Sequence, residues 1–263
     1  MTRRSEQRDG RGKRRRRGHL EDERPLVRRV GGRSRRVRVV YVACEGESTE
    51  PDYLEYLNER YGDTGSTPFR IQPIYRKNGM LPSETVEAVS EIAAEDEAWA
   101  LFDRDEHHDI LKAVKGAAAG NVDLAFSHPS FDLWLLLHFQ AFGGTQSGSS
   151  KLVIEKLRQT DAAFKDYGKR GDKSIEAARR DALERNQDNA VARARGLVKS
   201  CPHGSCAPGR AVTDPVDRDA GTRSPQQWAA RSGHAPDCPL LVRDPSTDVW
   251  RLLVSLGIHP TTR

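Results

Sequence analysis

The stretch VRVVYVACEGESTEPDYLEYL, residues 37–57, decides the fold of this chain. Residues 37–43 form a short apolar run of β-branched and aromatic side chains, which is typical of a buried strand in a parallel sheet. A glycine turn follows, in which Ser48 and Thr49 are candidate N-caps. Helical spacing of apolar residues then runs over residues 52–62. The segment therefore predicts a strand, a turn and a helix, which together open an α/β fold.

The same alternation continues along the next part of the chain. Further strands are expected at residues 69–75, 98–102 and 122–127, and further helices at residues 83–96, 107–119 and 129–142. In the helix at 83–96 we expect Val86, Val89 and Ile92 to point inward, and the helix at 129–142 is apolar nearly all round, as a buried helix would be. Strands that alternate with helices predict a mostly parallel sheet flanked by helices, here an α/β domain over residues 37–142.

The remainder, residues 143–263, is expected to be a helical C-terminal region. GGTQSGSS at 143–150 is typical of a flexible connection. Helices are expected at 151–160, over the Arg- and Ala-rich stretch 174–199, and at the end of the chain, where Ser246 or Thr247 would cap a helix with Val249, Leu252, Leu253 and Leu256 inward. Residues 200–243 are rich in Pro, Gly, Cys and His without periodicity, and are interpreted as an insertion.

The positive charge of the chain belongs to its N-terminal segment. Residues 1–38 hold 16 Lys and Arg against 5 Asp and Glu, a net charge of +11, whereas the whole chain carries +5, so residues 39–263 carry about −6. Residues 1–36 have almost no apolar periodicity and are expected to be a disordered basic arm. Such an arm can bind nucleic-acid phosphates by counterion release, or it can be a solvated extension without a ligand.

Composition also bears on compartment and cysteine use. No run of 18 apolar residues is present, so no membrane span is expected, and the arginine-rich start is not followed by the apolar stretch of a secretory signal. A cytoplasmic location is expected, where four cysteines in 263 residues do not form a disulfide framework.

Three of these cysteines lie together near the C-terminus, in the motifs CPHGSC and HAPDC. The motifs supply Cys201, Cys206, His234 and Cys238, with His203 as a further candidate, as ligands for a structural zinc ion. The alternative interpretation is reduced cysteines in a mobile loop.

Carboxylates follow two of the expected strands. Glu45 comes directly after the first strand, and Asp103 and Asp105 follow the strand at 98–102. Functional groups gather at the carboxyl ends of parallel strands, and residues two apart in extended backbone point to the same side. Carboxylates so close repel unless a cation neutralises them, and Mg²⁺ prefers such ligands. The alternative is that both aspartates cap the next helix and pair with Arg104.

The order of these motifs resembles the Toprim domain, the catalytic module of topoisomerases, primases and a set of metal-dependent nucleases. More closely, the chain resembles the RloB-like family of bacterial defence proteins. This resemblance rests on four stretches spread between residues 40 and 253, namely VACEGESTEPDYLEYL, LFDRDEH, SHPSFDLWLLLHF and DPSTDVWRLL.

The resemblance implies a role for each matching acid. Glu45 would be a metal ligand or general acid/base, and Asp103 and Asp105 would be ligands of Mg²⁺ or Mn²⁺. Glu50 would bind a second metal ion or favour the helix N-terminus through the helix dipole. Asp132, where family members commonly carry Glu, would support the site or cap a buried helix.

Other polar residues of the same motif are open to two interpretations. Ser127, His128 and Ser130 lie at the mouth of the expected strand at 122–127, where they could contact phosphate or take part in turns and caps. His138 is expected to be a core histidine with satisfied hydrogen bonds.

The resemblance thus implies a Mg²⁺-dependent Toprim-type nuclease that cleaves phosphodiester bonds in DNA or RNA. The resemblance further implies a partner, an ABC-type ATPase of the same restriction or phage-defence locus that controls the nuclease. One alternative is a non-catalytic adaptor that binds nucleic acid or the ATPase. Another is a phosphohydrolase with Asp103 as nucleophile, although His107 stands where such enzymes usually carry Thr or Val. The oligomeric state is left open.

Overall fold

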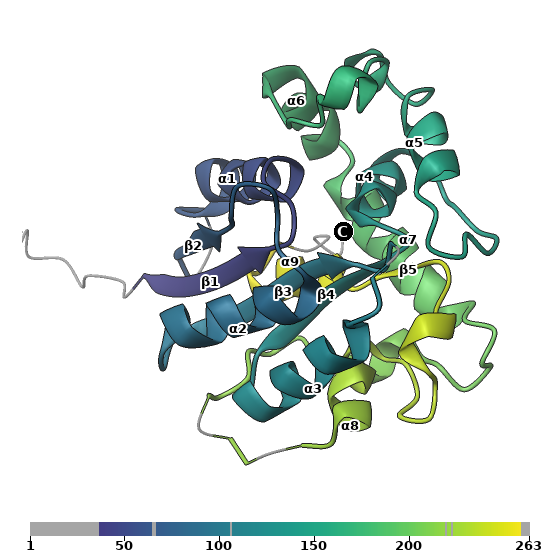
Figure 1. Ribbon diagram of the computed structural model, residues 1–263. Helices are drawn as coiled ribbons and strands as arrows, with labels where there is room; N and C mark the ends of the chain where they lie inside the picture. Colours follow the sequence, from purple (N-terminus) through teal and green to yellow (C-terminus); the bar gives the residue numbers. More distant parts are fainter. Residues whose placement is uncertain (1–36, 65–66, 106, 219, 222, 259–263) are drawn as a thin grey trace, which may run out of the picture. The chain divides into compact units, whose positions relative to one another are not determined.

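The computed structural model describes residues 37–64, 67–105, 107–218, 220–221 and 223–258, and the expected arm at 1–36 lies outside the described residues (Figure 1). The described strands form one sheet in the order β2-β1-β3-β4-β5. They are β1 (Arg38–Cys44), β2 (Phe69–Ile74), β3 (Glu97–Asp103), β4 (Asp123–His128) and β5 (Ser246–Thr247). All neighbours pair in parallel except β5, which is antiparallel to β4. The expected mostly parallel sheet is confirmed.

Helices connect these strands and continue beyond them. They are α1 (Thr49–Tyr61), α2 (Pro82–Ala93), α3 (Ile110–Gly120), α4 (Phe131–Phe139), α5 (Lys151–Leu157), α6 (Ala177–Glu184), α7 (Gln187–Lys199), α8 (Pro225–Ala229) and α9 (Val249–Ser255). None of the helices within the described ranges has the length and apolarity to cross a membrane.

The two faces of the sheet carry separate hydrophobic clusters because side chains alternate along each strand. Val40, Trp99 and Leu101 face a cluster that includes residues of α1, α4, α7 and α9. Ala100 and Phe102 face the opposite cluster, with α2, α3 and α8. Figure 1 shows α1 above the sheet and α2 and α3 beneath it. The C-terminal helices α7 and α9 therefore complete the core on the same face as α1.

The edge position of β2 explains how this strand accommodates Pro73. Proline has no N–H to give to a ladder, so it is tolerated in edge strands. Pro73 lies opposite Val42 of β1, and among the described strands β2 pairs with β1 alone.

Three local expectations are wrong. Ile92 is 53% exposed, because positions 86 and 92 lie about 120° apart around a helix and only Val86 and Val89 face the core. The stretch 174–199 forms two helices, α6 and α7, instead of one. Neither Ser246 nor Thr247 is the N-cap residue of the last helix, although Oγ1 of Thr247 accepts the N–H of Val249 (3.5 Å).

The last helix begins differently because tertiary pairing overrides the local capping signal. Ser246 and Thr247 pair with the end of β4 as β5, and the N-cap position of α9 is Asp248. The Oγ1 atom of Thr247 lies 2.9 Å from Oγ of Ser127, so its side chain is engaged across the sheet.

Candidate functional site

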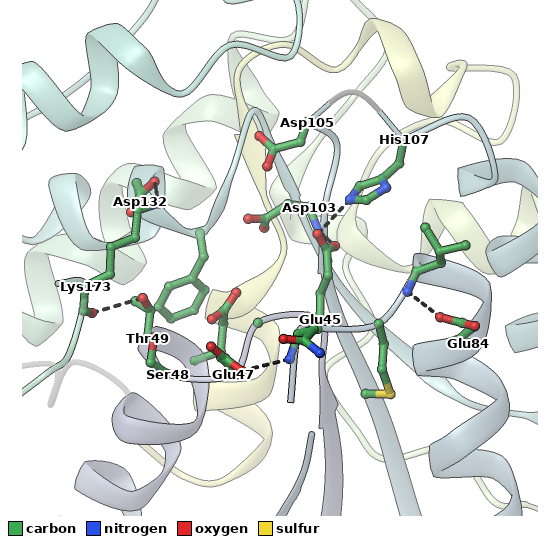
Figure 2. A pocket seen from close by; sticks show the side chains of 17 residues that line it. Glu45, Glu47, Ser48, Thr49, Glu84, Asp103, Asp105, His107, Asp132 and Lys173 are labelled. Carbon is green, nitrogen blue, oxygen red and sulfur yellow. Dashed lines mark hydrogen bonds and ion pairs between the residues drawn. The ribbon is translucent and has the colours of Figure 1, made fainter. Parts of the chain in front are cut away.

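Two neighbouring strands deliver Glu45 and Asp103 to the same point. Glu45 follows the last residue of β1, and its main-chain N–H continues the ladder by donating to the carbonyl of Leu101 (3.0 Å). The main-chain N–H of Asp103, the last residue of β3, donates to Oε2 of Glu45 (2.9 Å). With Asp105, these acids line one pocket with a volume of about 580 Å³ (Figure 2). The structure thus brings the three expected acids together.

A turn after β3, and not extended backbone, places the Asp105 side chain at the pocket. The strand ends at Asp103, and Asp105 has a φ of 26°, in the left-handed region that residues other than glycine rarely adopt. Its N–H donates to the carbonyl of Pro129 (3.1 Å), and Nη1 of Arg104 donates to its carbonyl (2.9 Å). The expected spacing of two residues along a strand is therefore wrong, although the Asp105 side chain still lies beside Asp103 (Figure 2).

Burial and mutual repulsion shape the electrostatics of these acids. Asp103 is 8% exposed, and burial together with the charges of Glu45, Glu50 and Asp105 raises its pKa well above the ordinary value. The pKa of Glu45 is also raised, chiefly by burial, while the Asp103 N–H and His107 act in the opposite direction. Within the described residues, the buried Oδ1 of Asp103 has no hydrogen-bond partner.

Glu50 adds a fourth carboxylate from the first turn of α1. It is 7% exposed, and burial, with the charges of Glu45 and Asp132, raises its pKa to about 7. A side chain at Gly46 would overlap the carboxylate of Glu50. A larger residue at position 46 would therefore displace the Glu50 carboxylate from its present position.

Asp132, in the first turn of α4, is held by three polar groups. Nζ of Lys173 lies 3.0 Å from Oδ2, the hydroxyl of Tyr167 donates to Oδ1 (2.6 Å), and the Ser130 hydroxyl donates to Oδ2 (3.2 Å). Asp132 and Lys173 both line the pocket (Figure 2). Ser130 therefore orients an acid of the pocket.

Two residues of the pocket were missed by the sequence reasoning. His107 places Nε2 2.7 Å from Oε1 of Glu45, and its place in LFDRDEH could have signalled this role. Lys173 supplies a cation among the acids, from a segment without helical or strand periodicity. No local pattern marks Lys173, because only the packing of the C-terminal region against α1 and α4 brings it to the pocket.

Ser127 and His128 have contacts away from this pocket. Ser127 is bonded to Thr247 of β5, and Nε2 of His128 lies 3.4 Å from Oδ2 of Asp244. Neither residue is among those that line the pocket within the described residues.

His138 is the expected core histidine. Its Nδ1 donates to the carbonyl of Trp134 (3.0 Å), and Nε2 lies 3.1 Å from Oε1 of Gln187. Burial lowers the pKa of His138 to about 4, so the ring is neutral at physiological pH.

The other expected ligand set is gathered at a separate place. Cys201, Cys206, His234 and Cys238 each offer a ligand atom, and these atoms lie within 4.8 Å of one another. His203 lies outside this group, with Nε2 3.6 Å from Oδ1 of Asp237.

The acidic pocket has the chemistry that a Mg²⁺ or Mn²⁺ ion requires. Such ions prefer carboxylate oxygens and retain waters for a phosphate-bearing ligand. The unpartnered Oδ1 of Asp103 and the raised pKa values of Glu45 and Asp103 indicate carboxylates whose charge lacks full compensation from the protein. The donor types of Glu45, Asp103 and Asp105 therefore suit a hard divalent cation.

Comparison with known proteins gave one result. A family model described as RloB-like protein matches residues 40–256, which is most of the chain. No curated protein and no solved structure matches the chain significantly.

Proposed function

The chain belongs to the RloB-like family, and we propose that it is a metal-dependent Toprim-type nuclease that cleaves phosphodiester bonds in nucleic acid. The observation that carries this proposal is the convergence of Glu45, Asp103 and Asp105 in one pocket at the carboxyl edge of β1 and β3. Acids this close remain ionised together only when a cation compensates their charge. A pocket rich in carboxylates, with few protein cations, is suited to a bound divalent metal ion.

The residues of the pocket divide into ligands and groups that control a proton. Asp103 and Asp105 would hold Mg²⁺ or Mn²⁺, with Glu45 as a further ligand or as general acid/base. When bound, the metal ion neutralises the scissile phosphate and lowers the pKa of a coordinated water. Glu45 is fixed by the Asp103 N–H at one oxygen and by His107 at the other, and burial raises its pKa, which favours a role as a group that accepts and releases a proton.

Asp132 and Lys173 lie on the opposite side of the pocket from His107 (Figure 2), and Glu50 also lines the pocket. Glu50 would bind a second metal ion, or it would tune the charge of the pocket from the first turn of α1. The ammonium group of Lys173 compensates the negative charge of Asp132 and would bind a phosphate group.

The biological setting belongs to the same proposal and rests on the family resemblance. The nuclease would be an effector of bacterial anti-phage defence or restriction, controlled by an ABC-type ATPase of the same locus. Its substrate would be DNA or RNA, and the basic segment at residues 1–36 would add affinity for phosphates.

The direct experiment is a cleavage assay of the full chain, with and without the neighbouring ATPase, on DNA and RNA. We expect cleavage with Mg²⁺ or Mn²⁺ and none with EDTA. Asp103→Asn and Glu45→Gln should abolish it, whereas Glu55→Gln, an exposed position of α1 outside the pocket, should cleave normally.

The outcomes separate the nuclease from the alternative of a non-catalytic adaptor. Full activity of Asp103→Asn would overturn the assignment of the site. Binding of nucleic acid or ATPase by the wild-type chain without metal-dependent cleavage, under every combination of metal and partner, would favour the adaptor.

A further inference from the structure

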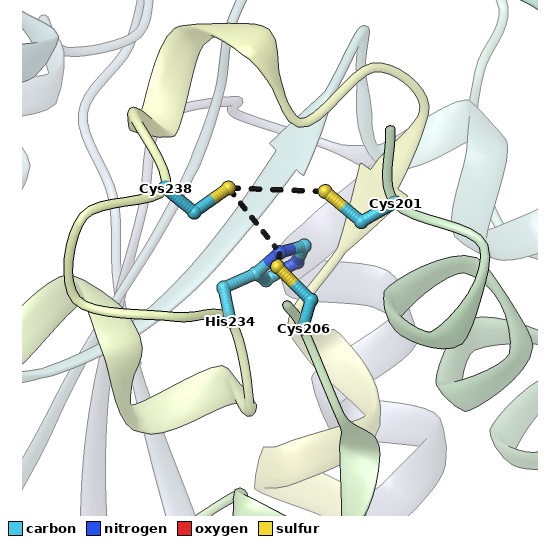
Figure 3. A group of neighbouring side chains, drawn as sticks. All are labelled: Cys201, Cys206, His234 and Cys238. Atoms are coloured by element: carbon cyan, nitrogen blue, oxygen red, sulfur yellow. Dashed lines mark hydrogen bonds between the residues drawn. The ribbon is translucent and has the colours of Figure 1, made fainter. Parts of the chain in front are cut away.

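A second cluster of metal-ligating side chains lies outside the acidic pocket (Figure 3). Cys201 and Cys206 come from the segment that follows α7, and His234 and Cys238 come from the segment after α8. These pairs are about 30 residues apart in the sequence, yet Figure 3 shows all four side chains pointing toward one point. All four cysteines of the described chain are free thiols, so the cluster is not a disulfide.

Three distances within the cluster are close to those of a tetrahedral ligand set. Sγ of Cys201 lies 3.8 Å from Sγ of Cys238, and Nδ1 of His234 lies 3.9 Å from Sγ of Cys238 and 3.2 Å from Sγ of Cys206. Around a tetrahedral zinc ion with bonds of about 2.3 Å to sulfur and about 2.0–2.1 Å to nitrogen, two sulfurs lie about 3.8 Å apart and a sulfur and a nitrogen about 3.5 Å apart. The side chains are thus already positioned around a space of the right size.

Main-chain turns present these side chains in the manner of a metal-binding loop. The N–H of Gly204, which has a φ of 78°, donates to the carbonyl of Cys201 (3.0 Å) and closes a tight turn. Gly233 has a φ of 95° and accepts from the N–H of Ala207 (2.9 Å), which joins the two segments next to His234. The N–H of Ala235 points to Sγ of Cys206 (3.4 Å), as N–H groups do toward thiolates.

We propose that this cluster is a structural zinc site with the ligands Cys201, Cys206, His234 and Cys238. Four protein ligands complete the tetrahedron, which leaves no open position for catalysis, so the ion holds structure. Three thiolates around Zn²⁺ leave a net charge of −1. Arg243 compensates this charge, because its guanidinium lies beside Cys238 and donates to the Cys238 carbonyl (2.9 Å).

Few apolar side chains stabilise the chain immediately around this cluster. The hydrophobic cluster at this place consists of Cys201, Ala235 and Cys238, with Cys206 packed against it, and contains no large aliphatic or aromatic side chain. A group this small stabilises a loop weakly, whereas zinc binding supplies folding free energy directly. The ion would therefore join the chain around Cys201 and Cys206 to the chain around His234 and Cys238, where apolar packing is weakest.

The zinc site also supports residues next to the acidic pocket. Arg243 leads into Asp244, whose Oδ2 accepts the N–H groups of Gln146 (2.7 Å) and Ser147 (2.6 Å). The neighbouring Gly148 packs so closely on the carbonyl of Asp105 that a Cβ would come within 2.5 Å of it. Loss of zinc should therefore loosen the loop that holds Asp105, as well as the insertion.

Metal analysis of the full chain, purified without chelators or added metal, tests the site. We expect one zinc ion per chain by mass spectrometry of the metal content. His234→Asn and Cys206→Ser should lose it. The matched control His203→Asn, a neighbouring histidine whose ring lies outside the cluster, should keep it. Asp103→Asn should also keep it, so this result is independent of the nuclease proposal.

Cobalt substitution keeps the test decisive if a variant fails to fold. The wild-type chain loaded with Co²⁺ should show the intense visible bands of a tetrahedral ion and thiolate-to-cobalt charge transfer. A folded wild-type chain that contains no zinc and gives no tetrahedral cobalt spectrum would overturn the proposal. The same conclusion would follow from a Cys201–Cys238 disulfide in the freshly purified protein, or from wild-type zinc content in both ligand variants.

Discussion

The main-chain N–H of Asp103 donates to the carboxylate of Glu45, so the Glu45 side chain helps to fix the end of β3, where Asp103 lies. The parallel register of β1 and β3, with Cys44 opposite Leu101, sets these residues at the same level of the sheet. The backbone ladder therefore decides how near the two carboxylates lie. The pKa values of both rise chiefly because burial removes the water that would stabilise their charged forms.

The first prediction concerns charge repulsion in the metal-free protein. Asp103→Asn should be as stable as the wild-type chain or more stable, because it removes one of several repelling buried acids. Mg²⁺ should raise the unfolding midpoint of the wild type, by an amount equivalent to about 2.7 kcal/mol at 100 times the Kd, and should raise that of the variant much less.

Thermal unfolding with and without Mg²⁺ measures both effects, with the exposed position Asp63→Asn as control. If Asp103 only capped the following helix, the variant would instead lose about 0.5–2 kcal/mol and keep any response to Mg²⁺.

The second prediction concerns pH. Because the pKa of Glu50 is raised from 4.5 to about 7, the folded chain holds a proton there that the unfolded chain releases. The contribution of Glu50 to stability should therefore fall as pH rises from about 4.5 to about 7, by an amount on the order of 3 kcal/mol.

His138 acts in the opposite direction, since its lowered pKa makes stability rise with pH up to about 6.5. The test is therefore the difference in free energy of unfolding between the wild type and Glu50→Gln. It is measured by urea unfolding of the metal-free protein from pH 5 to 8. That difference should grow in favour of the variant with rising pH, and a constant difference would contradict the assignment. Glu55→Gln is the control.

The third prediction concerns Lys173, the cation beside Asp132 and Glu50. Lys173→Met should destabilise the metal-free chain by about 1–3 kcal/mol at pH 8 and by less at pH 5, because more of the neighbouring acids are ionised at the higher pH. Lys173→Arg should restore most of the loss. Equal losses at both pH values would indicate that Lys173 contributes by packing alone.

The fourth prediction concerns an ion network within the fold. Asp123 is 1% exposed and accepts from Nε of Arg231 (3.0 Å) and from Nη2 of Arg251 (2.8 Å). Asp123→Asn would leave two guanidinium groups without their anion, so we expect a loss of about 3–5 kcal/mol in the free energy of unfolding. Asp181→Asn, exposed on α6, is the control for urea unfolding. A loss below about 1 kcal/mol would show that the guanidinium groups are solvated.

The fifth prediction concerns the basic segment at residues 1–36. Its deletion should weaken nucleic-acid binding and flatten the dependence of affinity on salt concentration, since fewer counterions would be released. Binding titrations at several salt concentrations measure the slope. An unchanged slope would leave this segment without a role in binding.

The sequence by itself determined the α/β alternation and the acids that follow two strands. The periods of 2 and 3.6 residues are local signals, and β1, α1, β3 and β4 all lie close to where those signals place them. The positions of Glu45 and Asp103 follow as well, because a parallel sheet brings the carboxyl ends of its strands to one edge.

Only the tertiary structure decided which distant side chains join these acids. Lys173 reaches the pocket because its segment is held by Thr49 of α1 and Asp132 of α4. Ser246 and Thr247 become a strand because they pair with the end of β4. Asp105 points inward through a left-handed turn that Pro129 and Arg104 hold in place. The physical reason is that such contacts depend on packing free energy summed over the whole core, whereas sequence periodicity reports only the neighbours of a residue along the chain.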